Sequence, residues 1–550
     1  MGVTRRDFLK SVAVPAGVIL LPGALRAMAE TTSSRQPNFL VIVADDMGFS
    51  DAGCYGGEIA TPNLDRLAAG GIRFTQCYST ARCWPSRACI LTGYYAQQVR
   101  RDSLPDLKGG TTGKRPAWAR LLPELLKPLG YRSYHSGKWH VDGKPVDGGF
   151  DRVFEYSDGD HHFLTAKKVA EIDPPLQPIK EEGYYASTAI ADYAIRHLRE
   201  HAETHPDRPF FQYLCFTEPH FPIQAPQEDI DRYRDRYLEG WDAVRQKRWK
   251  RMTEMGLIHC PLSKPDPESL PGWNLKAEEM TRQIGPGEVG KAIPWDQLTD
   301  AQKQFQATKM AIHAAMVDRI DREIGRVLDQ IRAMNAYENT VVLFVSDNGA
   351  SAEQMIRGDG HDPGAPPGSA KSFLCLGPGG STASNTPFRL HKVWVHEGGI
   401  SSPLIVHWPA GIAARGELRR DVCHFIDLVP TLLELGGGRW PQTWDGTPVP
   451  PTPGQSLVPA FARDGAAAHE FLWWCHMGNR AIRVGDWKLV AEGAAGPWEL
   501  YDMRTDRSES NNLADQQPEK VRELSERWTR FAEDCRRLAT SDGVTPADGK

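Results

Sequence analysis

Two pairs of polar residues each end an apolar run of the chain. The run PNFLVIVA ends at Asp45 and Asp46, and the run TVVLFVS ends at Asp347 and Asn348. Adjacent carboxylates raise each other's pKa unless a cation neutralises them. Carboxylate and amide oxygens suit a hard divalent ion such as Ca²⁺ or Mg²⁺. One such pair alone is typical of a cap or a solvated surface, but the two together predict a metal site.

A second candidate is Cys83, in the segment YSTARCWPSRACILTGYY. A proline, a serine and Arg87 follow shortly after it, and then an apolar helical run begins. The thiol is therefore expected at a helix N-terminus beside a guanidinium. Helix N-termini bind tetrahedral oxyanions through free N–H groups and the helix dipole. A disulfide with Cys89 is not expected, because positions six apart on one helix do not face each other.

Four further residues stand in short polar motifs. Lys138 and His140 belong to GKWH, His220 ends EPH, and Lys392 lies five residues before EGG. Each of them taken alone is typical of a surface or of a satisfied core residue. Several lie where apolar runs end, so together with the acidic pairs and Arg87 they predict a pocket for a sulfate or phosphate ester.

The elements that must position these residues alternate between strands and helices. Apolar runs ending in polar residues indicate a largely parallel sheet of an α/β fold, with its site at the carboxyl ends of the strands. A long amphipathic helix is expected within 298–334. Near the C-terminus we expect short antiparallel strands followed by a final helix, in the ranges 470–476, 480–492, 498–503 and 518–538.

The chain is long enough for more than one domain. Residues 171–300 are polar and rich in proline, which favours a solvated excursion, with a substrate rim as the alternative, and we expect one aromatic and basic helix over 231–252. A Pro/Gly-rich stretch at 436–454 is typical of a domain connection. We therefore predict a catalytic α/β domain over 36–440 and a smaller C-terminal subdomain over 455–540.

The N-terminus has the pattern of an export signal. Paired arginines in TRRDFLK precede an apolar segment with two prolines, and small residues follow it. The apolar run is too short to span a bilayer. We predict a twin-arginine signal peptide over 1–29 with cleavage after Ala29, hence a periplasmic or secreted protein exported by the twin-arginine translocase, with no membrane span in its mature form.

Composition excludes some classes of protein. The formal net charge of the 550 residues is −5, which gives no indication of nucleic-acid binding. Ten cysteines in a chain of this length are not a disulfide scaffold. None of them forms a CxxC pair, so a structural zinc site is not expected.

These motifs together resemble one family. CWPSRACILTG fits the sulfatase motif C-x-P-S-R-x-x-x-L-T-G, and ADD, GKWH, EPH, SDNG and KVWVHEGG follow in the order that type I, formylglycine-dependent sulfatases show. The segment GWDAVRQKRWKRMTEMGLI is similar to the long bacterial arylsulfatases in particular. The resemblance implies an alkaline-phosphatase-like fold: a large, mostly parallel sheet flanked by helices, plus a smaller antiparallel C-terminal sheet with a helix.

The resemblance also implies an activity. Sulfate esters of phenols or of carbohydrates would be hydrolysed to inorganic sulfate and a phenol or alcohol. A formylglycine-generating enzyme would convert Cys83 to formylglycine, whose hydrated aldehyde is the nucleophile, and Arg87 would hold this residue. Ca²⁺, in preference to Mg²⁺, would be bound by Asp45, Asp46, Asp347 and Asn348.

The remaining roles follow from the same resemblance. Lys138 and Lys392 would neutralise the sulfate. His220 with Lys392 would assist the departing oxygen, and His140 would take the proton that releases sulfate. Asp347 would accept a proton from the attacking hydroxyl.

Some positions depart from the family pattern or leave the substrate open. Met477 stands where many members have an acid, so a substrate contact by His476 is only a hypothesis. Trp84 and the pair Tyr94–Tyr95 lie near the nucleophile, where they could stack on an aryl ring or a sugar.

Two other functions remain open at this point. The first is a phosphonate or phosphate ester hydrolase on the same fold. The second is a non-catalytic protein that binds an oxyanion or a glycan and keeps Cys83 as a thiol.

Overall fold

The structure is a computed structural model that describes residues 36–104, 110, 113–156, 162–163, 169–172, 183–358 and 360–543. The signal peptide predicted for residues 1–29 lies outside the described residues. Pro37–Lys550 form one compact unit. The division into a catalytic domain over 36–440 and a subdomain over 455–540 stays a prediction. No helix in the described ranges is long and apolar enough to cross a membrane.

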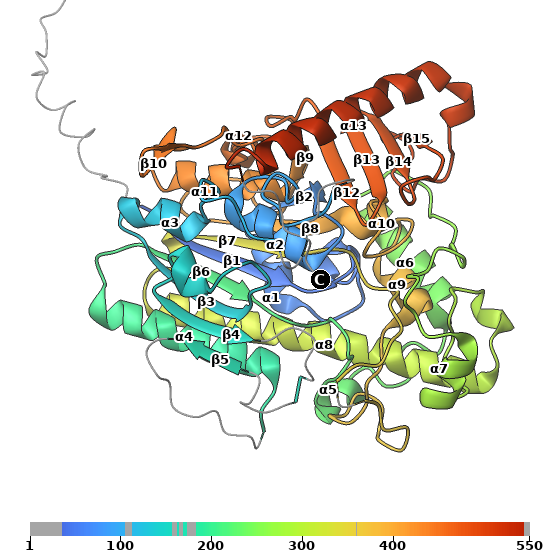
Figure 1. Cartoon of the computed structure of the whole chain (residues 1–550). Coiled ribbons are helices and arrows are strands. Elements are labelled where there is room, and N and C mark those ends of the chain that lie inside the picture. Colours follow the sequence, from blue (N-terminus) through green and yellow to red (C-terminus); the bar gives the residue numbers. More distant parts are fainter. Residues whose placement is uncertain are drawn as a thin grey trace, which may run out of the picture. The chain divides into compact units, whose positions relative to one another are not determined.

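A mixed sheet forms the centre of the unit (Figure 1). Within the described ranges it has nine strands in the order β5-β4-β3-β6-β1-β7-β8-β2-β9. The strands are β1 (Asn38–Ala44), β2 (Ile72–Tyr78), β3 (Arg132–Lys138), β4 (Arg152–Tyr156), β5 (Val169–Ile172), β6 (Phe210–Cys215), β7 (Thr340–Ser346), β8 (Ser401–His407) and β9 (Glu417–His424).

Most neighbouring strands of this sheet run parallel. The central strand β1 pairs in parallel with β6 on one side and with β7 on the other. The strands that run against the rest are β5, paired with β4, and β8, between β7 and β2. The expected large, mostly parallel sheet is therefore confirmed. Because β8 is reversed, its amino end is the one that lies at the edge where the parallel strands end.

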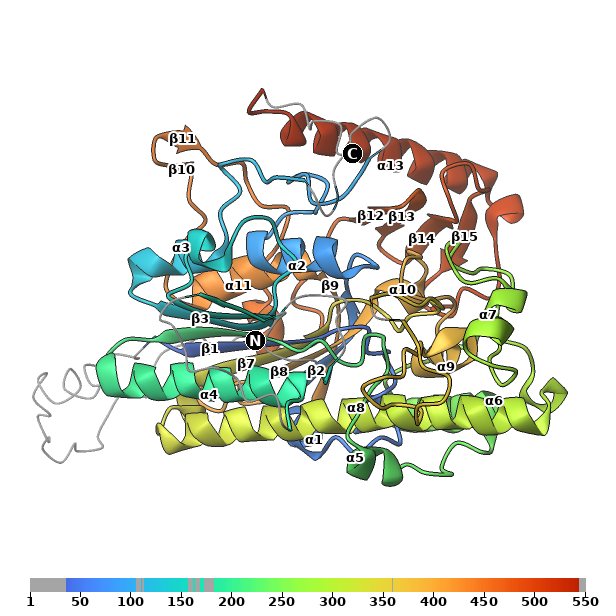
Figure 2. The same ribbon diagram turned by 60° about the horizontal axis from the view of Figure 1, so that its bottom comes forward.

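Helices cover both faces of the sheet (Figure 2). Along β1, Leu40 and Ile42 belong to the core shared with the helices α4 and α8, whereas Val41 and Val43 belong to the core shared with α2 and α11. This alternation follows from the two-residue period of a strand. Since both faces are buried, β1 is a continuous apolar run.

The helices vary widely in length, and α8 is by far the longest. Their bounds are α1 (Pro62–Ala69), α2 (Cys83–Thr92), α3 (Leu122–Leu126), α4 (Ala186–Thr204), α5 (Gln227–Asp231), α6 (Gly240–Glu254), α7 (Ala277–Gln283), α8 (Asp300–Ala333), α9 (Gly377–Ser384), α10 (Glu397–Ile400), α11 (Leu428–Leu435), α12 (Val458–Ala462) and α13 (Pro518–Ala539).

The C-terminal part forms a separate antiparallel sheet with one long helix, as expected (Figure 1). Its strands are β12 (Leu472–His476), β13 (Asn479–Val484), β14 (Trp487–Ala491) and β15 (Glu499–Asp502). The segment 480–492, expected as one strand, is two strands joined by a tight turn. Trp474 donates its indole N–H to the carbonyl of Ser79, so this sheet contacts the chain just before α2. A short hairpin, β10 (Thr443–Trp444) with β11 (Thr447–Pro448), lies within the Pro/Gly-rich stretch.

Two local expectations were wrong, and one strand was missed. The helix expected over 231–252 is broken between α5 and α6, where Asp235 and Gly240 have positive φ angles. The range 171–300 is not wholly an excursion, because it contains α4 and the internal strand β6. Strand β9 was not expected, because its sequence ELRRDVCH is rich in charged residues, as suits a sheet edge.

Candidate active site

The two polar pairs, Asp45–Asp46 and Asp347–Asn348, meet because their strands are neighbours. In the parallel pairing of β1 with β7, Ala44 lies opposite Ser346. Asp45 and Asp46 therefore leave the sheet beside Asp347 and Asn348, and all four side chains are buried. This is the carboxyl edge of the sheet, where open α/β folds place their ligands.

Two cations contact the carboxylates of Asp45 and Asp347. Lys138 Nζ lies 2.5 Å from Asp45 Oδ2. Arg87 Nη2 lies 2.8 Å from Asp347 Oδ2 and 3.4 Å from Asp45 Oδ2, and Arg87 also donates to the carbonyl of Lys138. Arg87 thus joins α2 to the ends of β1, β3 and β7.

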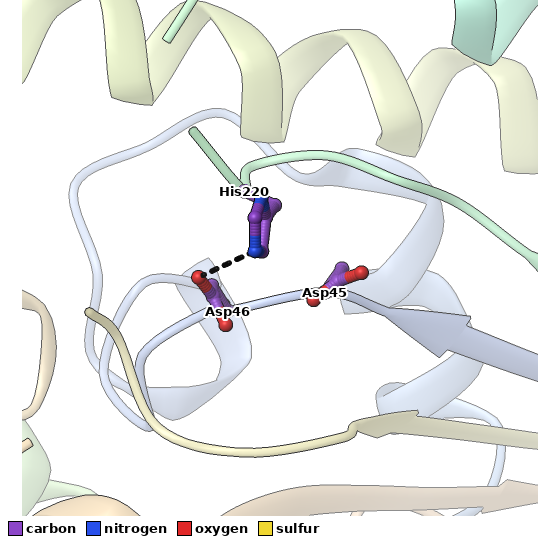
Figure 3. A group of neighbouring side chains, drawn as sticks. All are labelled: Asp45, Asp46 and His220. Atoms are coloured by element: carbon purple, nitrogen blue, oxygen red, sulfur yellow. Dashed lines mark ion pairs between the residues drawn. The ribbon is translucent and has the colours of Figure 1, made fainter. Parts of the chain in front are cut away.

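Asp46 is the centre of a second set of contacts. Lys392 Nζ lies 2.9 Å from its carboxylate, and Asn348 Nδ2 donates to its Oδ1 at 2.6 Å. Figure 3 shows His220 pointing its Nε2 toward Asp46 Oδ2, at 3.8 Å. The Nδ1 atom of His220 lies 2.7 Å from the carbonyl oxygen of Phe221.

Cys83 is the first residue of α2, as expected. It is buried, and the side chain of the preceding residue, Arg82, does not cap the helix. Arg87 follows one helical turn later, on the same face. The negative charge of a Cys83 thiolate would raise the pKa of Lys392, so these two side chains lie within electrostatic reach of each other.

Gly137 allows β3 to lie close enough to β6 to place Lys138 in the site. A Cβ atom added to Gly137 would lie 1.8 Å from the carbonyl oxygen of Cys215 on β6, so only glycine fits this close approach of two strands. Lys138 follows as the last residue of β3, and His140 lies just beyond it. The ring of His140 meets the ring of Trp84 edge to face, with centroids 5.9 Å apart.

Glycines also shape the loop that carries Lys392. A Cβ atom on Gly398 would lie 2.2 Å from the carbonyl oxygen of Leu390, and one on Gly399 would lie 1.9 Å from that of Trp394. The chain around Lys392 therefore folds back over the start of α10, which explains the spacing between the lysine and EGG.

The backbone is strained at several of these positions. Asp46, His140 and Val393 have φ angles of 66°, 57° and 89°. Such angles cost about 1–3 kcal/mol each for residues with a side chain and cluster at functional sites. Two of the three residues were predicted site residues, and the third adjoins Lys392.

Burial and neighbouring charges shift the pKa values in this cluster. Burial, with Asp45 next in effect, raises the pKa of Asp347 to about 7, against the opposing influence of Arg87. Burial lowers the pKa of His220, and the charge of Lys392 lowers it further. Burial would lower the pKa of Lys392, but Asp46 and Glu353 outweigh it and hold that pKa above its usual range.

The donor set fits a divalent cation. Asp45, Asp46 and His220 each offer a ligand atom, and these atoms lie within 4.8 Å of one another. Asn348 Oδ1 is buried and accepts no hydrogen bond. An orphaned amide oxygen is costly unless something positive contacts it. Asp347 adjoins the group, with its Oδ1 3.4 Å from the backbone N of Asp46.

The structure also brings in two residues that the sequence did not indicate. Glu353 is buried and lies 3.2 Å from Lys392 Nζ and 3.2 Å from Arg82 Nη2. A single acid in a loop has no spacing that could reveal it. Arg82 had one signal, its place directly before Cys83.

The pair Tyr94–Tyr95 was expected near the pocket, but it does not lie there. Tyr94 packs against Trp118 and Trp440, and Tyr95 packs against Trp473. Both are buried in these contacts and unavailable to a ligand. His476 is buried too, with its Nδ1 2.8 Å from Asp102 and its ring 5.6 Å from that of Trp84.

Comparison with known proteins gives a consistent result. Residues 37–438 match the Sulfatase family model, and residues 389–534 match the model for the C-terminal part of N-sulphoglucosamine sulphohydrolase. The chain is 33% identical to an uncharacterized sulfatase of Schizosaccharomyces pombe, over 91% of this chain and 94% of that protein. It is 30% identical to an arylsulfatase of Klebsiella aerogenes, over 82% of this chain and 96% of that protein.

A solved structure has a similar fold. The crystal structure of Ps i-CgsB with a bound k-i-k-neocarrahexaose has a TM-score of 0.62, covering 93% of this chain and 96% of that one. The two sequences are 21% identical, so this likeness concerns the fold alone.

Proposed function

The chain belongs to the sulfatase family and is a sulfuric ester hydrolase, and on this premise we propose that residue 83, converted from cysteine to formylglycine, is its nucleophile. The overall reaction takes a sulfate ester and water to inorganic sulfate and a phenol or alcohol. The observation that carries the proposal is the place of Cys83 on the first turn of α2, which no N-cap side chain caps, one turn before Arg87 and within electrostatic reach of Lys392.

A formylglycine at position 83 fits these surroundings. Its hydrated aldehyde would supply one hydroxyl to attack sulfur and a second to expel sulfate as the aldehyde forms again. Arg87 is locked by Asp347 and Asp45 at the base of the helix turn, so it would hold residue 83 at a fixed distance from the carboxylates.

A divalent cation fits the ends of β1 and β7. We propose Ca²⁺, in preference to Mg²⁺, with Asp45, Asp46, Asp347 and Asn348 as its ligands; when bound, it would draw negative charge from the sulfate oxygens. The orphaned Asn348 Oδ1 and the raised pKa of Asp347 support this assignment. Asp45, Asp46 and Asp347 balance the charges of Arg87, Lys138 and Lys392, so a divalent cation would leave a positive surplus for an anionic ester.

The lysines and histidines would act on the two ends of the ester. Lys138 and Lys392 would hold the sulfate group by charge. His220 Nε2, with the ammonium of Lys392, would assist the departing oxygen, which matters most for alkyl and sugar alcohols because their oxyanions leave poorly. Asp347 would accept the proton of the attacking hydroxyl, and His140 that of the second.

The cellular setting follows from the paired arginines at the N-terminus. We propose export by the twin-arginine route to the periplasm, after a sulfatase-maturing enzyme has converted Cys83 in the cytoplasm. That route carries folded proteins, and Cys83 is buried in the folded chain, which supports a conversion before export.

A substrate panel with two matched variants tests this proposal. Sulfate release from 4-nitrophenyl sulfate is compared with turnover of the corresponding phosphate and phosphonate esters. Cys83→Ala should lower sulfate release by at least about a thousandfold, because the nucleophile is lost. Cys89→Ala, also buried on α2, should retain it.

Two results would contradict the proposal. One is a phosphonate rate that exceeds the sulfate rate by orders of magnitude. The other is equal sulfate release by Cys83→Ala and the unaltered enzyme.

A further inference from the structure

Three buried polar atoms near the proposed nucleophile have no hydrogen-bond partner among the residues that the structure describes. They are Nε of Arg82, Nε1 of Trp84 and Nε2 of His476. Arg82 and Trp84 flank Cys83 in the chain, whereas His476 is the last residue of β12. A buried polar group without a partner is costly, so three of them together point to a ligand that supplies the missing partners.

The three side chains form one group, with Trp84 in the middle. The Arg82 guanidinium lies 5.0 Å from the centroid of the Trp84 ring, and the ring centroids of Trp84 and His476 are 5.6 Å apart. Arg82 also reaches the residue after His476, because its Nη1 lies 4.0 Å from Met477 Sδ. We call Arg82, Trp84 and His476 the Trp84 group.

Asp102 determines which nitrogen of His476 can accept a hydrogen bond. Its Oδ2 lies 2.8 Å from His476 Nδ1 and also accepts from Gln97 Nε2 at 3.2 Å, while its Oδ1 accepts from the backbone N of Ser103 at 2.8 Å. An ionised carboxylate only accepts hydrogen bonds, so Nδ1 carries the proton and Nε2 of the neutral ring is an acceptor. His476 is 0% exposed, so bulk solvent does not satisfy that acceptor.

The Trp84 group adjoins the place proposed for the leaving group. Arg82 Nη2 lies 3.2 Å from Glu353 Oε1, and Glu353 Oε2 lies 3.2 Å from Lys392 Nζ. The turn between β12 and β13 is fastened to the same loop, because Asn479 Nδ2 donates to the carbonyl of Val393 at 3.0 Å. A leaving group beside Lys392 would therefore lie against the Trp84 group.

The three atoms have the polarity that complements one hydroxyl group. The N–H groups of Arg82 and Trp84 can only donate, and Nε2 of His476 accepts. A hydroxyl offers two lone pairs and one O–H donor, which is one partner for each of them. An unsubstituted phenyl ring offers none of these partners, and a carboxylate has no proton to donate to His476.

From these contacts we infer that the Trp84 group binds a free hydroxyl on the leaving group of the ester, and that Asp102 is a positioning residue for His476. The inference rests on the proposed function, since it assumes that the ester is cleaved at residue 83. The hydroxyl can belong to a sugar ring or to a phenol that carries a second hydroxyl, because both present the same atoms. A substrate without it leaves the three polar atoms unpaired, so the enzyme discriminates against such esters.

Two variants each remove one hydrogen-bonding atom and keep most of the packing. Trp84→Phe removes the indole N–H and retains a ring beneath Arg82. His476→Asn keeps an amide N–H near the place of Nδ1, for Asp102, and removes Nε2. Two sets of esters separate the two sources of a hydroxyl. The phenol set is phenyl sulfate with its 2-, 3- and 4-hydroxy derivatives, and the sugar set is methyl galactoside 6-sulfate with its 2-, 3- and 4-deoxy derivatives.

The measured quantity is the ratio of kcat/KM for an ester with a given hydroxyl to kcat/KM for the matching ester without it. In the unaltered enzyme this ratio should reach about ten or more for at least one hydroxyl. Each variant should lower that ratio about threefold to tenfold, the effect of one lost hydrogen bond, and should change kcat/KM for the ester without the hydroxyl by less than about twofold. Trp408→Phe should leave the ratio unchanged, because this indole donates to Asn339 at the opposite edge of the sheet.

A ratio that both variants lower supports the inference, and the set in which it falls shows whether the hydroxyl belongs to a phenol or to a sugar. The inference is overturned, and the proposed function stands, if sulfate is released but no hydroxyl is preferred in either set. The same holds if the preference is unchanged in either variant, or if the variants slow all esters alike. If enzyme carrying formylglycine releases sulfate from none of the esters, the proposed function fails as well.

Discussion

The molecule contains two clusters of buried charge. They adjoin in the sequence where Lys392, a member of the first, precedes Glu397, a member of the second, by five residues. The strand-end cluster comprises Asp45, Asp46, Asp347, Asn348, Arg87, Lys138 and Lys392. The Glu397 cluster comprises Glu397, Lys488, Arg507, Glu509 and Tyr78, and it joins α10 to the C-terminal sheet and the loop after it. Both clusters are buried, and both combine acids with cations.

The two clusters differ in how well their acids are satisfied. In the Glu397 cluster, Lys488 lies 2.9 Å from Oε1 of Glu397, and Tyr78, Ser401 and Arg507 all donate to its Oε2. Burial opposes the charge of Glu397, but Lys488 and Arg507 outweigh it and lower its pKa to about 2. In the strand-end cluster, the pKa of Asp347 is raised to about 7 instead.

This is the difference expected between a cluster that stabilises the fold and one that serves the proposed function. A buried acid that its neighbours fully compensate stabilises the fold, whereas one that they leave partly uncompensated is suited to bind a cation or to move a proton. The strand-end cluster also has the orphaned Asn348 Oδ1, whereas Glu509 Oε1 in the Glu397 cluster lies 2.8 Å from Lys488 Nζ. A positive φ does not distinguish the clusters, because Asp46 and Glu509 both have one.

The largest expected effect is that of breaking the strand-end cluster. Asp347→Asn should lower sulfate release about a hundredfold or more, because it removes a proposed Ca²⁺ ligand and proton acceptor. In the presence of a chelator, its stability at pH 8 should equal or exceed that of the unaltered enzyme, since a poorly compensated buried charge is lost. Turnover and urea unfolding measure the two effects.

Calcium provides the control for this variant. Ca²⁺ at a hundred times its dissociation constant should stabilise the unaltered enzyme by about 2.7 kcal/mol and should stabilise Asp347→Asn much less. Equal stabilisation of both proteins would place the cation elsewhere and contradict the assignment.

The next largest effect is expected in the Glu397 cluster, where a substitution should lower stability and leave kcat nearly unchanged. Glu397→Gln should destabilise the fold by about 3–5 kcal/mol, because it leaves Lys488 and Arg507 buried with one acid fewer. The kcat of the molecules that remain folded should change little, and Ca²⁺ should still stabilise them. A large fall in kcat at unchanged stability would show that the two clusters do not differ as described.

The smallest expected effect is a loss of stability at low pH. The pKa of Glu397 is lowered from 4.5 to about 2, so its stabilising effect is complete above pH 4.5 and is lost as the pH falls toward 2. This shift corresponds to roughly 3 kcal/mol. Urea unfolding of the unaltered enzyme should therefore weaken over this range more steeply than that of Glu397→Gln. Parallel curves for the two proteins would refute the lowered pKa.

The sequence predicted the parts of the site that depend on strand ends. Apolar runs before Asp45 and Asp347 are strong signals because buried parallel strands are apolar on both faces. The reversed direction of β8 was not predictable, since a short apolar run carries no direction. The break between α5 and α6 was missed because the positive φ of Asp235 leaves no trace in the apolar pattern.

Contacts over long separations explain what else was missed. Glu353 joins Arg82, Trp273 and Lys392, which are far apart in the chain, so no local motif could reveal it. Tyr94 and Tyr95 follow the end of α2, about three helical turns after Cys83, and they pack on Trp440 and Trp473 instead of facing the pocket. Nearness in sequence therefore favoured two residues that lie away from the pocket and gave no sign of Glu353, which contacts Lys392.

The most direct test of the central claim is the mass of one peptide. Trypsin cleavage after Arg82 and Arg87 releases Cys83–Arg87, and its mass shows whether residue 83 is a thiol or an aldehyde. Preparations converted to different extents can be compared for sulfate release from 4-nitrophenyl sulfate. We predict an aldehyde in active enzyme and a rate proportional to the converted fraction. An intact thiol in protein that turns over at the full rate would contradict the account.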